Sequence, residues 1–234
     1  MSGAGSVSGD LLKVRQFIVN FHVLRDGDGL YLIDTGFIGG VRCLDEALHS
    51  RGWGGLALRG ILLTHGHLDH VLNVKALVER SGAWVAAPRL DADHYAGHAD
   101  YTGLSRITGG LEAMGRAALS YRRFVPDRLL DDGDSIGIWQ GLQAVHLPGH
   151  TPGHTGYYCQ DRRLLFTGDL FASYAHFPHL PPRILNQHPE QMRASLEKAL
   201  ALDLEGVIPS HCDEASPEVH LERLRRLADG ESIN

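Results

Sequence analysis

The sequence of 234 residues is poor in cysteine, with only Cys43, Cys159 and Cys212. Three scattered cysteines cannot form a disulfide framework, so a small disulfide-stapled domain is excluded and a cytoplasmic location is expected. Long apolar runs are absent as well, since no stretch approaches the length that spans a bilayer. Residues 1–10 have neither the basic nor the apolar segment of a signal peptide, and we expect them to form a polar, flexible tail.

Positive charge is also scarce. The 22 Lys and Arg residues are outnumbered by 28 Asp and Glu residues, and the formal net charge is −6. Because nucleic-acid binding normally needs a basic face, we expect no nucleic-acid partner. With no membrane-spanning run either, we expect a small molecule to be the partner. Hydrophobic residues at 43% and charged residues at 21% are the balance of a globular chain that can bury a sizeable core.

Residues 11–234 alternate between strand-like and helix-like patterns, and we predict that they form one domain. Strands are predicted at 14–24, 30–36, 60–65, 83–87, 129–138, 141–147, 156–160, 163–168 and 206–211, with 129–138 and 141–147 forming a hairpin. Helices are predicted at 40–51, 70–80 and 189–201, and after Ser216, which would cap the last one. Residues 91–125 lack strand patterning and are predicted to be a helical insertion. This order fits helices outside a pair of packed sheets.

Histidine is the residue in excess, with 15 copies against 7 Phe and 7 Tyr. The stretch 64-THGHLDH-70 holds His65, His67, Asp69 and His70, and it lies where a predicted strand ends and a helix begins. A turn there would direct the first two histidines to one ion and the other two side chains to another. Imidazole with carboxylate suits zinc, iron or manganese. The structural alternative is a polar turn that caps the helix.

Further candidate ligands follow other predicted strands. Asp34 closes one strand, Asp169 follows 164-LLF-166, and His211 follows 207-VI-208. His150 lies in 148-PGHTPGH-154. Polar side chains that come directly after buried strands sit on a rigid scaffold and face one edge of it.

These motifs, in this order, resemble those of the metallo-β-lactamase superfamily, in its glyoxalase II and lactonase-like branch. The matching elements are Asp34-Thr35-Gly36, His65-x-His67-x-Asp69-His70, Pro148-Gly149-His150-Thr151, Gly168-Asp169 and Ser210-His211. The resemblance implies an α+β fold, a four-layer αβ/βα sandwich with the site on one edge between the two sheets.

The resemblance also implies a role for each motif residue. One metal would be held by His65, His67 and His150, and a second by Asp69, His70 and His211. Asp169 would bridge the two. Asp34 would not bind metal but would fix the orientation of a ligand histidine. His154 is expected to form hydrogen bonds or pack beside the site, and Cys212 to pack within the structure.

Two metals ~3.5–4 Å apart would lower the pKa of a shared water and supply hydroxide near neutral pH. We therefore predict two divalent ions, zinc first, with iron or manganese as alternatives. Asp69 would orient the hydroxide as well as bind metal. Tyr174, five residues after Asp169, is a candidate to hydrogen-bond a substrate oxygen.

The predicted function is hydrolysis of a small ester, thioester or lactone. Secreted β-lactamase activity is not expected without a signal peptide. Glutathione thioesters are not expected either, because only about twenty residues follow Asp213, where glyoxalase II-type enzymes carry a longer helical region. Two alternatives stay open: a mononuclear-iron oxidoreductase like the persulfide dioxygenases, and a phosphodiesterase or nuclease.

The predicted insertion would roof the substrate pocket. Its apolar residues suggest a lid that favours an acyl or aromatic ester over a bare phosphate. These residues are Tyr95, Tyr101, Leu104, Ile107 and Met114. Two histidines of the same segment, His94 and His98, are predicted to lie on a surface helix face.

Overall fold

The computed structural model of the chain describes residues 9–17, 19–174 and 178–230. Its strands are β1 (Leu11–Arg15), β2 (Asn20–Asp26), β3 (Gly29–Ile33), β4 (Ala57–Leu62), β5 (Trp84–Pro88), β6 (Arg128–Leu130), β7 (Ser135–Ile136), β8 (Leu142–His146), β9 (Thr155–Cys159), β10 (Leu164–Gly168) and β11 (Gly206–Pro209). Its α-helices are α1 (Gly40–Arg51), α2 (Leu68–Val71), α3 (Val74–Ser81), α4 (Ala92–Ala96), α5 (Arg106–Ala118), α6 (Met192–Leu200) and α7 (Pro217–Ala228). Short 3-10 helices are η1 (Arg89–Asp91), η2 (Gly103–Ser105) and η3 (Arg183–Leu185).

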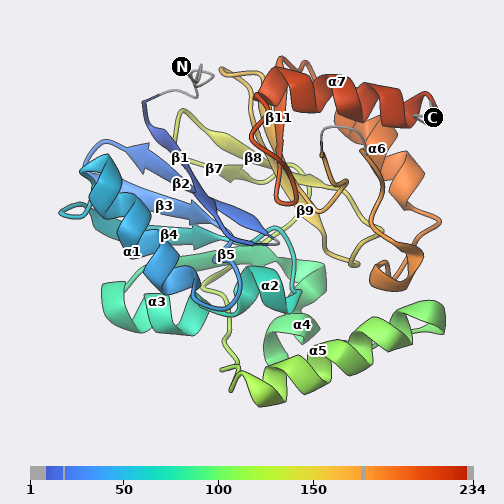
Figure 1. Cartoon of the computed structure of the whole chain (residues 1–234), viewed down its shortest axis with the longest axis horizontal. Coiled ribbons are helices and arrows are strands. Elements are labelled where there is room, and N and C mark those ends of the chain that lie inside the picture. Colours follow the sequence, from blue (N-terminus) through green and yellow to red (C-terminus); the bar gives the residue numbers. More distant parts are fainter. Residues whose placement is uncertain (1–8, 18, 175–177, 231–234) are drawn as a thin grey trace.

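The strands form two sheets that lie face to face. One sheet has the order β1-β2-β3-β4-β5-β6 and the other β11-β10-β9-β8-β7. Helices α1 and α3 cover the outer face of the first sheet, and α6 and α7 lie on the far side of the second (Figure 1). The chain is therefore a four-layer αβ/βα sandwich of the α+β class, as the resemblance implied.

Three apolar layers hold the four structural layers together. Leu44 of α1 and Leu77 of α3 pack with one face of the first sheet. Between the sheets lie residues such as Leu62 and Phe166. Leu196 of α6 is part of the third layer, between the second sheet and its helices. Side chains that alternate along each strand supply both faces, which is why a period of two marks the strands in the sequence.

Strand ends from both sheets meet at one edge of the sandwich. Strands β3 and β4 are parallel, as are β10 and β11, so the carboxyl ends of each pair lie together. Backbone hydrogen bonds join the two sheets at this edge: Thr155 N–H donates to Thr64 O at 2.8 Å, and Asn20 N–H donates to Ser210 O at 2.8 Å. Residues that follow these four strands therefore converge.

The prediction of one strand over 14–24 was wrong. The chain turns between β1 and β2, which pair antiparallel with Arg15 opposite Asn20. The turn contains the apolar residues Phe17 and Val19 and has neither Gly nor Pro, so the sequence carried no strong signal for the reversal. The helix predicted over 70–80 is also divided, into α2 and α3. Asn73 lies at the break and donates through Nδ2 to the backbone oxygens of residues 35–37 at 2.8–3.0 Å.

The predicted hairpin over 129–138 and 141–147 was wrong as well. Strand β6 pairs with β5 in the first sheet, whereas β7 pairs with β8 in the second. The turn residues between them, Asp131 to Asp134, carry the chain from one sheet to the other. Sequence patterns give strand segments but not their partners, because pairing depends on long-range contacts.

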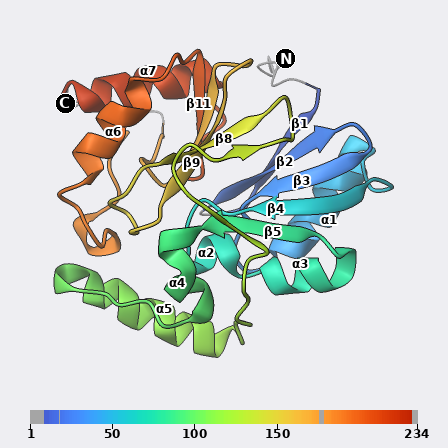
Figure 2. The same cartoon turned by 180° about the vertical axis from the view of Figure 1, so that it is seen from behind.

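The segment predicted as a helical insertion does contain α4 and α5. Both helices lie at one end of the sandwich, beside α2, in the two opposite views (Figure 2). Among the described residues no helix has the length and apolarity needed to cross a membrane. Most of the predicted tail, residues 1–8, lies outside the described residues, and the single-domain organisation stays a prediction.

Candidate metal centre

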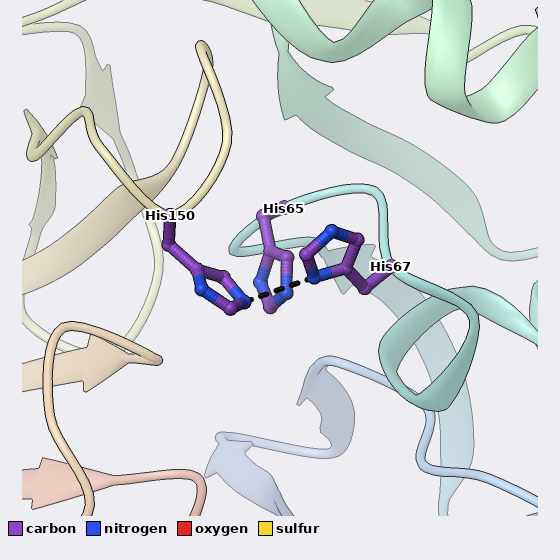
Figure 3. A group of neighbouring side chains, drawn as sticks. All are labelled: His65, His67 and His150. Atoms are coloured by element: carbon purple, nitrogen blue, oxygen red, sulfur yellow. Dashed lines mark hydrogen bonds between the residues drawn. The ribbon is translucent and has the colours of Figure 1, made fainter. Parts of the chain in front are cut away.

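Three histidines from two loops point at a common centre. His65 and His67 lie in the turn after β4, and His150 lies in the loop between β8 and β9 (Figure 3). One ligand atom from each lies within 4.8 Å of the others, and His67 Nδ1 is 2.9 Å from His150 Nε2. We call these residues the first ligand group; all three are buried.

A second ligand group lies beside the first. Asp69, His70 and His211 again have one ligand atom each within 4.8 Å of the others. His70 Nε2 is 3.6 Å from Asp69 Oδ2, and His211 Nε2 is 3.6 Å from the same oxygen. Asp69 and His70 lie in α2, and His211 follows β11.

Asp169, directly after β10, contacts both groups. Its Oδ2 is 3.4 Å from His150 Nε2 of the first group and 3.0 Å from His211 Nε2 of the second. Its Oδ1 is 3.3 Å from His70 Nε2. The seven residues predicted as ligands are thus brought together, with one carboxylate between the two sets.

Asp34 fixes the orientation of two of these histidines. Its Oδ2 lies 2.9 Å from His70 Nδ1 and accepts from Thr64 Oγ1 at 2.8 Å. Thr64 Oγ1 in turn is 3.0 Å from His65 Nδ1. A carboxylate accepts hydrogen bonds, so His70 donates from Nδ1, and His65 donates from Nδ1 to a hydroxyl whose own hydrogen is already used. Both rings therefore direct Nε2 to the centre, where a bound cation would take the place of any proton on it.

His150 is oriented in the same way by Asn186. The Asn186 Nδ2 donates to Pro181 O at 2.8 Å, which turns its Oδ1 toward His150 Nδ1 at 2.9 Å. His150 donates from Nδ1 and presents Nε2 inward. Asn186 was not predicted from the sequence, because it lies in an irregular segment with no pattern that marks a ligand-positioning residue.

His154 has both ring nitrogens in hydrogen bonds. Its Nδ1 is 2.9 Å from Leu147 O, and its Nε2 accepts from the Asp169 backbone N–H at 2.9 Å. No lone pair is left for an ion, so His154 positions Asp169 instead. Gly168 makes this contact possible, since a Cβ there would lie 2.8 Å from His154 Nε2 and its φ is +54°.

The inward atoms fit a cation. His65 Nε2, His70 Nε2 and Asp169 Oδ1 are buried and have no hydrogen-bond partner among the described residues. Burial lowers the pKa of His65 and His67 well below the usual range and also lowers that of His150. Neutral imidazoles with convergent lone pairs and a buried carboxylate are the donor set that zinc, iron or manganese prefers.

The second group has a different charge balance. Burial would lower the pKa of His211, but the Asp169 and Asp69 carboxylates raise it to about 9. Burial opposes the charge of Asp169, yet His211 and His70 hold its pKa well below the usual range. Without an ion, protons on these histidines balance the carboxylates, so a bound cation would displace protons.

Asp91, at the end of η1, was not predicted and joins the two loops of the first group. Its side chain is buried and accepts from Gly66 N–H at 2.8 Å, Thr151 Oγ1 at 2.7 Å and Gly153 N–H at 2.6 Å. Asp34 and Asp169 were selected because they follow buried strands. Asp91 comes soon after β5, so the same criterion would have found it.

Helix α5 holds the ligand turn from the other side. Glu112 Oε1 accepts from Leu68 N–H at 3.0 Å at the start of α2, and Arg116 Nη2 donates to Gly66 O at 2.7 Å. These two side chains also pair with each other at 3.0 Å. Gly66 allows a close approach on its other face, since a Cβ would lie 2.2 Å from His94 Cβ.

The predicted apolar lid was mostly wrong. Tyr95 is fully buried, whereas Leu104, Ile107 and Met114 are 54–63% exposed on the outside of the segment. Tyr101 alone reaches the site, with its ring stacked on His67 at 6.3 Å between centroids.

Two further predictions about nearby residues had different outcomes. His94 is buried, with Nε2 2.9 Å from Gln187 Oε1, so its predicted surface position was wrong, whereas His98 is exposed as predicted. Cys212 is buried and donates through Sγ to Pro209 O at 3.2 Å, which agrees with packing. Tyr174 is 39% exposed and lines one cavity with Asp169 and His211.

Comparison with known proteins places this geometry in a family. The chain is 30% identical over 197 residues to hydroxyacylglutathione hydrolase of Brucella ovis, covering 82% of this chain and 62% of that enzyme. It thus spans less than two thirds of that relative's length.

Two solved structures share the fold. A metallo-beta-lactamase family protein of Thermus thermophilus, TTHA1429, superposes with a TM-score of 0.73 at 19% identity, covering 96% of this chain and 80% of that one. The di-iron-bound form of TTHA1623 has a TM-score of 0.64 at 27% identity, covering 91% and 96%. Residues 14–211 match the family described as the metallo-beta-lactamase superfamily, and the chain belongs to that superfamily.

Proposed function

We propose that this chain is a hydrolase that binds two divalent metal ions and cleaves a small ester, thioester or lactone. The observation that carries the proposal is the pair of ligand groups that share Asp169, with His65, His70 and His150 each held so that Nε2 faces inward. A structural zinc site needs only four ligands, so seven convergent residues support a reactive centre.

Bound at the two groups, divalent ions would supply an ionised water near neutral pH and polarise the substrate carbonyl. The side chains then have separate tasks. Asp169 contacts histidines of both groups and would keep the ions close together. Asp69, whose side chain is 23% exposed, would orient the attacking oxygen. Tyr174 would donate a hydrogen bond to the substrate oxygen where negative charge builds.

We propose zinc as the first candidate metal, with iron as the alternative. The donor set suits both ions, and TTHA1623, 27% identical to this chain, binds two irons. A small-molecule partner and a cytoplasmic location stay predictions from the sequence.

Several features favour acyl substrates. The Brucella relative hydrolyses hydroxyacylglutathione by name, and the cavity beside Asp169 is walled mainly by apolar side chains. A carbonyl carbon next to an apolar group fits this surrounding better than a phosphodiester.

The first test is the metal content of protein purified without added metal or chelator, measured by elemental mass spectrometry. About two divalent ions per chain, with hydrolysis in a panel of esters, thioesters and lactones, is the expected result. A phosphodiester serves as the comparison substrate. A single iron per chain with oxygen consumption on a persulfide would replace the proposal by the oxidoreductase alternative.

A further inference from the structure

A small cavity, partly open to solvent, adjoins the second ligand group. Its volume is about 160 Å³, and Asp169 and His211 of the candidate centre are part of its lining. The walls are Phe171, Ala172, Pro181, Pro182 and Leu185, with Tyr174 and His179 completing the lining. One side of the candidate centre therefore opens onto carbon-rich walls.

The side chains that line the cavity offer few partners for a negatively charged group. No Lys or Arg occurs among the described residues that line the cavity, and the Asp169 carboxylate is part of the lining. The groups that can carry positive charge beside Asp169, His211 and any bound metal ions, belong to the candidate centre, so a negative charge at the end of an acyl group remote from the centre would face only the apolar walls. Removing such a charge from water without a partner is costly, so the cavity selects uncharged groups.

The cavity wall is part of the same framework that holds the metal ligands. Ala172 and His179 exchange two backbone hydrogen bonds, at 2.8 and 3.1 Å. Pro181 O accepts from Asn186, whose other side-chain atom orients His150. Leu185 lies one residue before Asn186, in η3, so its position relative to the centre is set by this network.

We propose that this cavity is the acyl site of the enzyme and accepts a short, uncharged, apolar group attached to the scissile carbonyl, with Leu185 setting its length. The inference rests on the proposed hydrolase function. The volume equals roughly five times the ~30 Å³ share of one liquid water, which is room for about four to six carbon atoms. Phe171, which is fully buried, forms a closely packed part of the wall.

The test compares the metal-loaded wild type with Leu185→Ala and Leu185→Trp on thioesters of acetate, butyrate, hexanoate and decanoate. Ile184→Ala is the matched control, because Ile184 is next in η3, 38% exposed and outside the cavity lining. We expect wild-type kcat/KM to peak at butyrate or hexanoate. Leu185→Ala should raise the decanoate-to-butyrate ratio about tenfold, and Leu185→Trp should lower the hexanoate-to-acetate ratio about tenfold. Ile184→Ala should leave both ratios unchanged.

A binding measurement separates this inference from the proposed function. Protein NMR of the metal-free chain should detect hexanamide binding in wild type and Ile184→Ala but not in Leu185→Trp. Succinamate, which carries a carboxylate, should bind more weakly than hexanamide to each variant that binds hexanamide. Hydrolysis with the same acyl ratios in all variants would overturn the acyl site while leaving the hydrolase intact. No hydrolysis of any substrate, with Leu185-dependent hexanamide binding, would overturn the hydrolase and leave the site. Equal binding of succinamate would overturn the site in either case.

Discussion

The two ligand groups differ in how they meet solvent. In the first group His65, His67 and His150 are 0, 5 and 2% exposed, whereas the side chains of Asp69 and His211 in the second are each 23% exposed. The first group is enclosed by α4, α5 and the loop that carries Asn186. The second faces the cavity lined by Leu185 and Tyr174. The first group is thus more closed to solvent than the second, as we expect if the first mainly holds an ion and the substrate approaches the second.

The largest effect should come from the residue common to both groups. Replacing Asp169 by Asn removes the charge that contacts both sets of histidines, so we expect both metal content and activity to fall, the latter by at least about a hundredfold. Elemental mass spectrometry and the thioester assay measure the two. Asp161→Asn, exposed at the opposite end of β10, is the control and should change neither. Full activity in Asp169→Asn would remove the bridging role.

Asp91 should have the next largest effect, although it contacts no ion. In Asp91→Asn an N–H would replace an oxygen that now accepts from Gly66, Gly153 or Thr151, so the two loops of the first group would loosen. We expect metal affinity to fall about 10- to 100-fold, as for other residues that position ligands. Competition with a chelator measures this, with Asp93→Asn on the exposed face of α4 as control. Unchanged affinity would contradict the positioning role.

The comparison of the two groups also predicts the order of metal loss. Titration with a chelator should remove one ion per chain at a concentration at least about tenfold below that needed for the other, because Asp69 and His211 of the second group are partly exposed. His211→Ala should abolish only the weakly held ion, while His179→Ala should keep both. Simultaneous loss of the two ions in wild type would show that the difference in burial has no effect on affinity.

Tyr174→Phe should have a smaller effect, confined to turnover. The loss of one hydrogen bond to the substrate oxygen is expected to lower kcat by about tenfold or less, with metal content unchanged. Tyr31→Phe, on a strand of the first sheet away from the cavity, is the control. A kcat equal to that of wild type would assign Tyr174 to the cavity wall alone.

The smallest effect concerns a buried histidine outside the centre. Burial, with lesser contributions from Lys13 and His220, lowers the pKa of His22 from 6.5 to about 3. The unfolded chain therefore takes up a proton near pH 6.5 that the folded chain does not, and stability present above pH 6.5 is lost as the pH falls toward 3. As the pH falls from 6 to 4, the free energy of unfolding of His22→Phe should rise relative to that of the wild type by ~1.4 kcal/mol per pH unit. Parallel denaturation curves across this range would exclude the shift.

Much of the centre could be predicted from the sequence because its residues follow local rules. A buried strand followed by Asp or His occurs at Asp34, Asp169 and His211, and parallel strands bring such ends to one edge. The turn after β4 packs four candidate ligands into six residues. The two-sheet architecture also followed from the alternation of strands and helices, whereas strand partners did not, as β6 and β7 illustrate.

The sequence by itself thus determined the candidate ligands, their order and the sandwich that carries them. Tertiary structure alone decided which residues hold those ligands in place: Asn186 lies 36 residues from His150, and Glu112 lies 44 from Leu68. It also decided that most of the predicted lid residues face solvent or the core, and that Leu185 lines the cavity. Local patterns report periodicity and chain reversals, but a hydrogen bond between distant segments depends on how the whole chain closes.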